Sequence, residues 1–538
     1  MALFAAAYAP AVALVLVATA ILYYVLSAIT AARRLRAFPG PRIASFSYYW
    51  MATTAYSGRM WEIYYKQATL QYGDVVRIGP GELLTSDPAI IRRLSATRTP
   101  QYRRSDWYNP NRLDPYEHSM FSLRDDVAHD RLKGRTAAAY AGRENPALEA
   151  EVDAVLKQLV DVIRTRYVAT RKPLDLAVLA QYFTLDSITK VAFGQAFGFL
   201  EREEDVHAYL QSILDIAPVM QMSSEVPFLN RIVTSPLVLS LAGPKVTDKA
   251  GIGRMMGVAR NIVAERFVPD AKDRRDMLGA FVRNGLSQRE CETEALFQII
   301  AGSDTTATAI RMTLLYIMTT PRVHARLREE VDHECADLGD DEIVPNSRAE
   351  TLPYLQAVVL EGLRMHPPFV GLPFKEVPPQ GDTLPDGRFV PGGTRIAPSI
   401  WALTRRKDVF GEDVDVFRPE RWLSNEPVHS EANSAAIGNG NGAANGNDKT
   451  NGTASERSED QERIANMRRT VDLIFGYGRW ACAGKTLAFL ELNKTLVEMM
   501  RRFELQLVYP LRPVSQINHN LFLQRDMWMQ ATERTRKA

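Results

Sequence analysis

The sequence predicts a mainly α-helical fold with small β-sheets, preceded by an N-terminal transmembrane helix. Helical hydrophobic patterns dominate from about residue 125 to residue 365, and short strand-and-turn stretches occur at residues 74–86 and at about 369–400. An uncharged, apolar run opens the chain. Apolar periodicity near 3.6 residues indicates helices, whereas short runs bounded by Gly and Pro indicate strands. We therefore expect one large helical body behind a membrane segment.

The expected membrane helix comes first in the chain. No charged residue occurs between Ala2 and Ala32, and the 22 residues Ala11–Ala32 would span about 33 Å as a helix, against a hydrocarbon core of ~30 Å. Arg33 and Arg34 end the span, because an arginine costs roughly 2.5–3.5 kcal/mol at the bilayer centre. Positive charge on this flank predicts that the rest of the chain is cytosolic. A cleaved signal peptide is the alternative, but the run is long and lacks a basic start.

Two further segments divide the body. The stretch 74–86 (DVVRIGPGELLTS) predicts two short strands around Gly79-Pro80-Gly81, a hairpin. Residues 424–463 contain almost no bulky apolar side chains. Such a segment cannot offset its ordering entropy, so we expect it to be disordered.

Composition excludes several classes of protein. The 65 basic and 63 acidic side chains give a net charge of +2, which offers no general attraction for nucleic acid. The three cysteines, Cys291, Cys335 and Cys482, show no CxxC spacing, which argues against a disulfide framework and for a reducing compartment. The eight histidines show no zinc-binding spacing, so a metal site would depend on Cys482.

A glycine-rich loop near the C-terminus carries the strongest chemical signal. It reads FGYGRWACAG over Phe475–Gly484 and runs directly into an apolar helix. Glycines at 476, 478 and 484 would let the backbone approach a bulky flat group and adopt positive φ. Backbone N–H groups near the helix start would favour the thiolate of Cys482. A thiolate held in this way suits a haem iron, whereas a buried inert thiol is the alternative.

A long helix upstream contains a second unusual segment. Ser287–Glu290 has the form of a capping box, and the helical pattern continues to Thr320, before Pro321. In its middle, the sequence AGSDTT (301–306) lowers helix propensity by roughly 3 kcal/mol. Local conflicts of this kind tend to mark functional sites.

The residues of this segment suggest oxygen chemistry. We expect Gly302 to leave room for a diatomic ligand and the hydroxyl of Thr305 to reach the carbonyl of Ala301. Asp304 beside Thr305 would supply an acid, so that the pair delivers protons. A plain core helix and a second membrane span are the alternatives. Charged Asp304 and Arg311 make the membrane alternative costly.

A third motif places Glu361 and Arg364 at i and i+3 on a helix, followed by FRPERW at residues 417–422. Alone, the first pair is most simply a solvated surface ion pair. Together with the cysteine loop and the AGSDTT segment, these motifs resemble the cytochrome P-450 superfamily. The segment Tyr72–Pro88 and the Gly-Arg-Trp loop are most similar to microsomal fungal members such as pisatin demethylase.

This resemblance implies a cytochrome P-450 fold, with a long central helix over haem b and an axial thiolate from Cys482. Asp304 and Thr305 would be the acid and alcohol of oxygen activation. Arg421 would join Glu361 and Arg364 in a buried structural network. Further haem contacts are implied for Phe475, Gly476, Gly478, Arg479, Gly484, His129, Lys133, Lys375, Ala301 and Gly302.

One position departs from the family pattern. Most members carry Arg or His two residues before the cysteine, whereas here Trp480 takes that place and Arg479 comes one residue earlier. Either residue is a candidate for contact with a haem propionate. By position, the chamber walls are expected from about 103–121, 205–245, 294–301, 368–374 and 515–525.

The implied function is that of a haem-thiolate monooxygenase. It would use O2 and electrons derived from NADPH to hydroxylate, epoxidise or desaturate an apolar small molecule in fungal secondary metabolism. NADPH-cytochrome reductase would supply the electrons, with cytochrome b5 as a further donor, at the endoplasmic reticulum membrane. A reductase-independent haem-thiolate isomerase or dehydratase is the alternative within the family, and a membrane-tethered binding protein is the alternative outside it.

The expected domains follow from these assignments. Residues 1–32 would be a single-pass anchor, 33–42 a basic Pro-Gly-Pro hinge, and 43–538 the haem-thiolate catalytic domain. The chamber is built from variable loops, so the sequence does not define the substrate or the atom attacked.

Overall fold

A central helix, α15 (Gln288–Met318), organises the molecule. It is 31 residues long, and Ser287 caps it in a capping box with Glu290, as the sequence predicts. It ends two residues before the expected Thr320. Helices α8 (Leu176–Phe193), α18 (Pro353–Met365) and α22 (Lys485–Arg502) pack around it. The computed structural model describes residues 2–96, 102–424 and 454–534, without the side chains of 2–13, 16, 17, 20 and 454–458.

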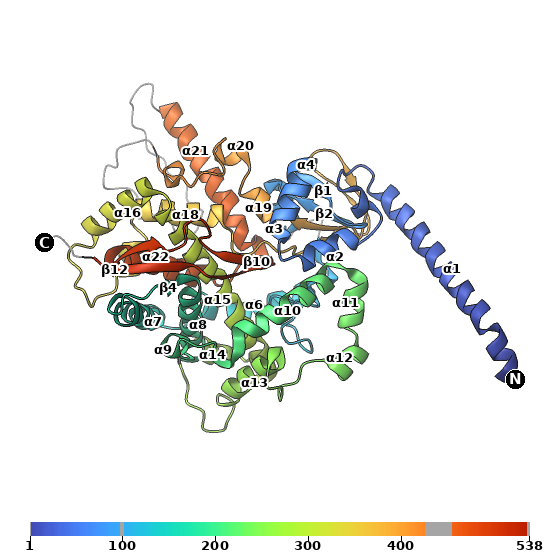
Figure 1. Ribbon diagram of the computed structural model, residues 1–538, viewed down its shortest axis with the longest axis horizontal. Helices are drawn as coiled ribbons and strands as arrows, with labels where there is room; N and C mark the ends of the chain where they lie inside the picture. Colours follow the sequence, from blue (N-terminus) through green and yellow to red (C-terminus); the bar gives the residue numbers. More distant parts are fainter. Residues whose placement is uncertain (1, 97–101, 425–453, 535–538) are drawn as a thin grey trace.

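The remaining helices surround this core and confirm the predicted mainly helical fold (Figure 1). Their bounds are α1 (Ala2–Arg34), α2 (Tyr49–Tyr56), α3 (Met60–Ile63), α4 (Leu70–Tyr72), α5 (Pro88–Leu94), α6 (Asp126–Tyr140), α7 (Leu148–Val162), α9 (Phe199–Arg202), α10 (Tyr209–Glu225), α11 (Pro227–Val233), α12 (Pro236–Ala242), α13 (Gly251–Ala264), α14 (Met277–Arg283), α16 (Pro321–Glu334), α17 (Asn346–Ala349), α19 (Ile400–Leu403), α20 (Lys407–Phe410) and α21 (Ala454–Val471).

Small sheets complete the body. The largest has the strand order β1–β2–β8–β5–β3, where β2 and β8 pair in parallel and the other neighbours are antiparallel. The predicted hairpin forms its edge, with Val76 opposite Leu84. The strands of this sheet are β1 (Val75–Arg77), β2 (Glu82–Thr85), β8 (Arg395–Pro398), β5 (Lys375–Glu376) and β3 (Arg103–Arg104).

Three other antiparallel sheets are smaller. The hairpin of β10 and β11 matters most for function, because its turn lines a cavity next to α15. The strands are β4 (Leu174–Asp175), β12 (Trp528–Glu533) and β9 (Phe503–Leu507) in one sheet, β10 (Ser515–His519) and β11 (Leu521–Arg525) in the second, and β6 (Asp382–Thr383) and β7 (Phe389–Val390) in the third.

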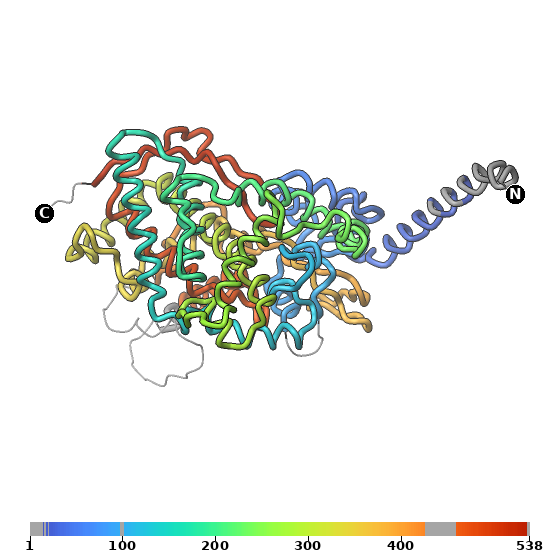
Figure 2. Tube along the Cα trace, turned by 90° about the horizontal axis from the view of Figure 1, so that it is seen from below, coloured from blue at the N-terminus to red at the C-terminus, as the bar shows by residue number. Residues whose placement is uncertain are grey.

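The N-terminal helix α1 extends away from the body, at the end opposite β12 (Figures 1 and 2). Its C-terminal end is tied to the first sheet, because the guanidinium of Arg77 donates hydrogen bonds to the carbonyls of Ala31 and Ala32. The expected Pro-Gly-Pro hinge packs on the same strand, where the backbone N–H of Arg77 donates to Pro39. Among the described residues, no helix combines the length and the apolar character that a membrane crossing requires.

The expected disorder at residues 424–463 is partly wrong. Residues 425–453 lie outside the described part of the chain, but residues 454–463 belong to helix α21. Arg463 and Asp460 form an i,i+3 ion pair at 2.5 Å, and Met467 further along is buried. Packing of the second half of α21 on the body thus extends the helix into a polar sequence that would not be helical alone.

Candidate active site

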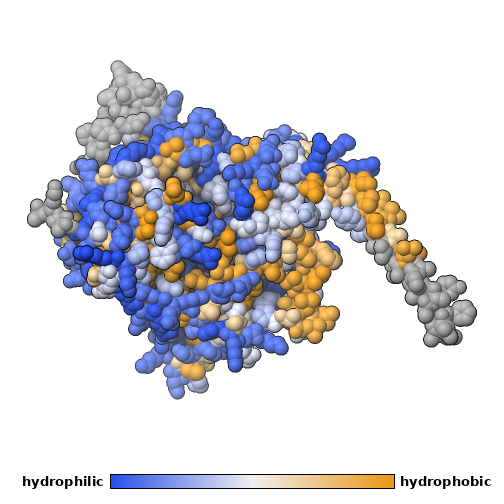
Figure 3. Space-filling view, in the orientation of Figure 1, coloured by the Kyte–Doolittle hydropathy of each residue, from blue (hydrophilic) through white to orange (hydrophobic). Residues whose placement is uncertain are grey.

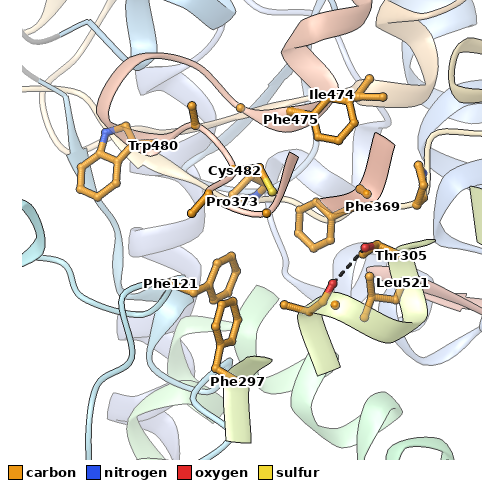
Figure 4. A pocket seen from close by; sticks show the side chains of 18 of the residues that line it. Phe121, Phe297, Thr305, Phe369, Pro373, Ile474, Phe475, Trp480, Cys482 and Leu521 are labelled. Carbon is orange, nitrogen blue, oxygen red and sulfur yellow. Dashed lines mark hydrogen bonds between the residues drawn. The ribbon is translucent and has the colours of Figure 1, made fainter. Parts of the chain in front are cut away.

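A cavity of about 410 Å³ lies between the cysteine loop and α15. Cys482 and Thr305 lie on opposite sides of it, and Phe369 and Leu521 lie close to Thr305 (Figure 4). Phe121 and Phe297 stack at 5.4 Å on another wall. Each of the five segments expected to form the chamber contributes lining residues, among them Tyr108, Met220, Ala301, Pro373 and Asn520.

The geometry of the cysteine loop explains two of its glycines. Gly476 and Gly478 have φ of 77° and 60°, a region that other residues seldom adopt. A Cβ on Gly476 would lie 2.6 Å from the carbonyl oxygen of Trp480, so the loop turns too tightly for a side chain. Gly484 differs from expectation: its φ is −89°, and it caps the N-terminus of α22.

Of the three cysteines, only Cys482 has an exposed side chain, and it is exposed to the cavity, whose walls still shield the thiol from bulk water. Its backbone N–H donates to the carbonyl of Phe475 at 2.7 Å. Burial raises the pKa of the Cys482 thiol, whereas the backbone N–H groups of Gly484 and Lys485 lower it. The expected backbone N–H donors are therefore present, but in the protein without a bound metal ion burial raises the thiol pKa by more than these donors lower it. A bound metal ion reverses this balance, because a coordinated thiol loses its proton.

Basic side chains gather beside the loop around the ring of Trp480, although burial lowers the pKa of His129 to about 4 and keeps its ring neutral. The Lys375 ammonium lies 3.7 Å and the Arg104 guanidinium 3.8 Å from the ring centroid, and the ring of His129 lies 4.2 Å away. Lys375 is 4 % exposed, and its Nζ has no hydrogen-bond partner among the described residues. Burial lowers its pKa well below the usual value. Such a cation is poised for an anionic group placed in the cavity.

The other predicted basic residues are engaged by protein groups. Lys133 lines the cavity and donates to the carbonyls of Arg479 and Ala481, at 2.6 and 3.1 Å. Arg479 does not line the cavity, because it forms ion pairs with Asp126 and Asp130 of α6, at 2.6 and 3.3 Å.

Several conclusions follow for the loop positions. Of the two candidates for contact with a haem propionate, Trp480 lines the cavity and Arg479 does not. Of the predicted contacts, Phe475, Gly476, Gly484, His129, Lys133, Lys375, Ala301 and Gly302 line it, whereas Gly478 and Arg479 do not. The sequence analysis placed Arg104 within the expected chamber wall but did not identify it as a neighbour of the loop, because the two are far apart in sequence and the pairing of β3 with β5 brings them together. Burial lowers the pKa of Arg104 to about 10.

The α15 wall confirms one expectation and corrects another. The Thr305 hydroxyl donates to the carbonyl of Ala301 at 3.0 Å, as predicted. Gly302 was expected to leave room for a diatomic ligand. A Cβ there would instead lie 2.6 Å from Cγ1 of Ile188 on α8. Close packing of two helices therefore requires this glycine, and the side chain of Ile188 fills the space.

Asp304 lies outside the cavity lining. Its carboxylate accepts a hydrogen bond from the Tyr209 hydroxyl at 2.8 Å, at the start of α10. Burial raises the pKa of Asp304 to about 6, against the lowering effects of Tyr209 and Arg311. Asp304 and Thr305 are adjacent in sequence, so they point in different directions on the helix.

A carboxyl group that the sequence analysis missed does line the cavity. Glu491, on α22 nine residues after Cys482, is 1 % exposed and accepts a hydrogen bond from the Ser187 hydroxyl. Burial raises its pKa to about 8, although hydrogen bonds from Ser187 and Thr306 oppose the rise. The signal in the sequence is a single acidic residue within the apolar stretch TLAFLEL.

A buried ion network supports the region behind the loop. Glu361 accepts hydrogen bonds from Arg364 at 2.8 Å and from Arg421 at 2.9 Å, and all three side chains are fully buried. Trp422, where the family has Phe, donates its indole N–H to the same carboxylate at 2.9 Å. Burial raises the pKa of Glu361, but the two arginines outweigh it and the net pKa is lowered. The predicted network is thus present, with one additional donor.

The residues around the cavity fit haem. A flat apolar group needs apolar walls, a thiol for the iron, and cations for its carboxylates. The cavity combines apolar walls, Cys482, and an unpartnered buried cation at Lys375. Within the described residues, no group of three or more His, Cys, Asp or Glu side chains could hold a metal ion.

Comparison with known proteins agrees with this fit. A family model described as Cytochrome P450 matches residues 41–443. The chain belongs to the cytochrome P450 family. It is therefore a haem-dependent monooxygenase, an oxidoreductase whose iron has a cysteine thiolate ligand. The matched range ends before Cys482, so the assignment of that residue depends on the geometry described above.

Individual relatives support the same assignment. The chain is 44 % identical to "Cytochrome P450 monooxygenase ABA1" of Pyricularia oryzae over 529 residues, which is 96 % of each chain. It is 40 % identical to "Cytochrome P450 monooxygenase aba1" of Botryotinia fuckeliana over 93 % of this chain and 92 % of that one. A solved structure, "Crystal structure of a Cytochrome P450 (CYP102L1)", shares the fold with a TM-score of 0.63 at 19 % identity, over 87 % of this chain and 93 % of that one.

Proposed function

We propose that this P450 uses O2 and electrons from NADPH to hydroxylate, epoxidise or desaturate an apolar small molecule, with Cys482 as the axial ligand. One observation carries the proposal. The thiol of Cys482 and the hydroxyl of Thr305 line opposite sides of a single cavity whose other walls are mainly apolar (Figure 4).

The haem would lie between the cysteine loop and α15. Phe475, Gly476 and Gly484 would bound one face, and Ala301 and Gly302 the other. Lys375 would bind a haem carboxylate, with His129 and Lys133 beside it, and this contact would supply the anion that the buried ammonium lacks. When bound, haem supplies the activation of dioxygen.

Protons for this reaction would come from the chain. The Thr305 hydroxyl lines the cavity and would hold a proton on the side of the cavity opposite Cys482. Asp304 would act one step behind it, because the Tyr209 hydroxyl now holds its carboxylate outside the cavity. Glu491 is a second proton carrier, since its pKa of about 8 keeps it protonated at neutral pH.

The ligand assignment is tested with Cys482→Ser and, as a matched control, Cys291→Ser, whose thiol is buried away from the cavity. We expect the first variant to lose the carbon-monoxide difference spectrum of a thiolate-bound haem, and the second to retain it. An unchanged spectrum in Cys482→Ser would refute the assignment.

The electron source separates the proposal from the alternative reaction. NADPH-cytochrome reductase, or cytochrome b5 as a further donor, would be the partner of a monooxygenase. A haem-thiolate isomerase or dehydratase needs neither reductase nor O2. Incubation with extracts of fungal metabolites, with and without NADPH and reductase, followed by mass spectrometry, discriminates the two. Products that form equally well without NADPH would contradict the proposal.

The biological setting is inferred from the relatives and the surface. The relatives come from fungi, which supports a role in fungal secondary metabolism. Attachment of α1 to the endoplasmic reticulum membrane, with the body cytosolic, is supported by its exposed Leu14, Val15, Ile21 and Leu22.

A second apolar area supports the same attachment. Exposed side chains of α11 and α12, including Phe228 and Leu241, form an apolar area near the base of α1 (Figures 1 and 3). Extraction of microsomes at alkaline pH tests attachment: we expect the full chain to stay in the pellet and a chain lacking residues 2–34 to be released more readily. Equal release of both chains would refute it.

A further inference from the structure

Three side chains on one face of α6 hold the cysteine loop. Asp126, Asp130 and Lys133 occupy positions i, i+4 and i+7, so they lie on the same side of the helix. The two carboxylates form ion pairs with the guanidinium of Arg479, whereas Lys133 donates to backbone carbonyls of the loop. The loop is therefore attached to α6 through its backbone as well as through a side chain.

The hydrogen bonds of Lys133 act on the peptide unit of Cys482. Its Nζ donates to the carbonyl of Ala481 at 3.1 Å, and this carbonyl belongs to the same peptide unit as the N–H of Cys482. That N–H donates to the carbonyl of Phe475 at 2.7 Å, at the start of the loop. Hydrogen bonds in series polarise and strengthen one another. The second bond of Lys133, to the carbonyl of Arg479 at 2.6 Å, fixes the preceding turn of the loop.

The positive charge of Lys133 has no counter-ion in the described part of the chain. Its side chain is half-buried, its two hydrogen-bond partners are neutral carbonyls, and no described carboxylate forms an ion pair with it. Lys485, whose charge also acts on the sulfur of Cys482, differs because it forms an ion pair with Asp472 at 2.8 Å. A sulfur that binds a metal ion loses its proton and becomes an anion beside Lys133.

We propose that Lys133 is a positioning residue for the axial ligand: it fixes the peptide unit of Cys482 and places a positive charge beside the sulfur. This charge limits the electron density that the thiolate donates to the iron. A contact with a haem carboxylate is a different role, and the loop already uses two of the three ammonium donors. The inference rests on the proposed assignment of Cys482 and deepens it.

The first measurement is the midpoint reduction potential of the haem iron in the detergent-solubilised holoenzyme, by spectroelectrochemical titration. Lys133→Met keeps an apolar side chain of similar length and removes both the donors and the charge. Loss of a positive charge beside the sulfur disfavours the reduced form. The ratio of reduced to oxidised protein at a fixed potential is expected to fall about tenfold, which corresponds to a midpoint about 59 mV lower.

The second measurement is the C–O stretching frequency of the ferrous carbon-monoxide complex, by infrared spectroscopy. This frequency falls when the sulfur on the opposite side of the iron donates more electron density. We therefore expect a lower frequency in Lys133→Met. A contact between Lys133 and a haem carboxylate predicts instead an unchanged frequency and faster transfer of haem to apomyoglobin.

Three further variants separate the role of Lys133 from general effects of charge. Lys133→Arg retains the charge and the donors, so both values should return towards those of the unaltered protein. Arg131→Met is the matched control, because it removes an equal charge from an exposed position of the same helix, where water and salt screen it. Lys133→Gln removes the charge but keeps amide donors, and it should shift both values in the same direction if Lys133→Met does not retain haem.

An unchanged stretching frequency in Lys133→Met, or in Lys133→Gln where the first variant loses haem, would overturn the inference. Equal shifts in Arg131→Met would also overturn it, because any charge on α6 would then have the same effect. Failure of the assignment of Cys482 gives a different result, since the unaltered protein would then keep its carbon-monoxide spectrum in Cys482→Ser. The two failures are therefore distinguishable.

Discussion

Two of the three acidic or hydroxyl groups near the cavity carry a proton at neutral pH, and burial determines which carboxyl group is one of them. The pKa of Glu491 is about 8 and that of Asp304 about 6, so at neutral pH Glu491 is mainly protonated and Asp304 mainly ionised. Thr305 carries its proton at any physiological pH and bonds to a carbonyl in its own helix. The cavity is thus bordered by two proton-holding groups, Thr305 and Glu491, with a carboxylate behind the wall.

Replacing Thr305 by Ala removes the hydroxyl next to the cavity and leaves the walls apolar. We expect oxygen use to become uncoupled, with several-fold more hydrogen peroxide released per product, because the proton is no longer delivered in place. Peroxide and product are quantified per NADPH consumed. Thr308→Ala is the matched control, since Thr308 is on the same helix but does not line the cavity. Tight coupling in Thr305→Ala would contradict the role assigned to Thr305.

The pKa of Glu491 predicts a pH dependence of stability. Burial raises this pKa from 4.5 to about 8, so between these values the folded protein binds more protons than the unfolded chain. The contribution of Glu491 to stability is therefore full below pH 4.5 and is lost as the pH rises towards 8. One pKa unit corresponds to about 1.4 kcal/mol, so the loss is at most on the order of 5 kcal/mol.

Glu491→Gln should remove this component. Denaturant unfolding at pH 5 and pH 8 is compared for the two proteins, and the decrease in the free energy of unfolding is expected to be smaller in the variant. Glu225 and Glu294, with pKa values raised to about 8 and about 7, contribute equally to both proteins and cancel. An identical decrease in both proteins would show that Glu491 titrates normally.

At the scale of elements, close packing of α15 on α8 determines what Gly302 does. The helix capping box and the Thr305 bond could be predicted, because each depends on local spacing along one segment, whereas the family resemblance indicated the members of the Glu361 network. The reason for Gly302 could not be predicted, because it depends on Ile188, which lies more than a hundred residues away in sequence. The direction of Asp304 was equally hidden, since Tyr209 on another helix determines it.

Gly302→Ala tests this packing. The added Cβ would meet Ile188 Cγ1 at 2.6 Å, and overpacking of this kind costs about 1–3 kcal/mol of stability. The thermal midpoint is expected to fall, and in a double-mutant cycle Gly302→Ala should cost less in the Ile188→Ala background than in the unaltered protein. Gly134→Ala on α6 is the matched control. No atom lies within 4 Å of the Cβ that it adds, so it should stabilise the protein by about 0.5–1 kcal/mol. Equal effects of the two single variants would refute the packing argument.

At the scale of the whole molecule, the cysteine loop depends on elements that are distant in the chain. The Glu361 carboxylate on α18 accepts from Arg421 and Trp422 in the short helix η6 (Pro419–Trp422). Arg421 also donates to the carbonyl of Asp413. This network fixes the segment that leads through residues 425–453 towards α21 and the cysteine loop. The sequence indicated its members by resemblance, but only the fold shows how many donors one carboxylate satisfies.

Arg421→Met should therefore disturb the site from a distance. Removing one partner leaves the fully buried Glu361 carboxylate underpaired, which typically costs about 3–5 kcal/mol. We expect a lower thermal midpoint and faster transfer of haem to apomyoglobin. Arg418→Met is the matched control, because its side chain is 44 % exposed and, among the described residues, forms its ion pair with Asp413 alone, so it should cost less than about 1 kcal/mol. Adding Glu361→Gln to Arg421→Met leaves the fully buried Arg364 without its carboxylate, so the double variant should be less stable than Arg421→Met. A double variant as stable as Arg421→Met would show that the loss comes from packing of the arginine and not from the charges of the network.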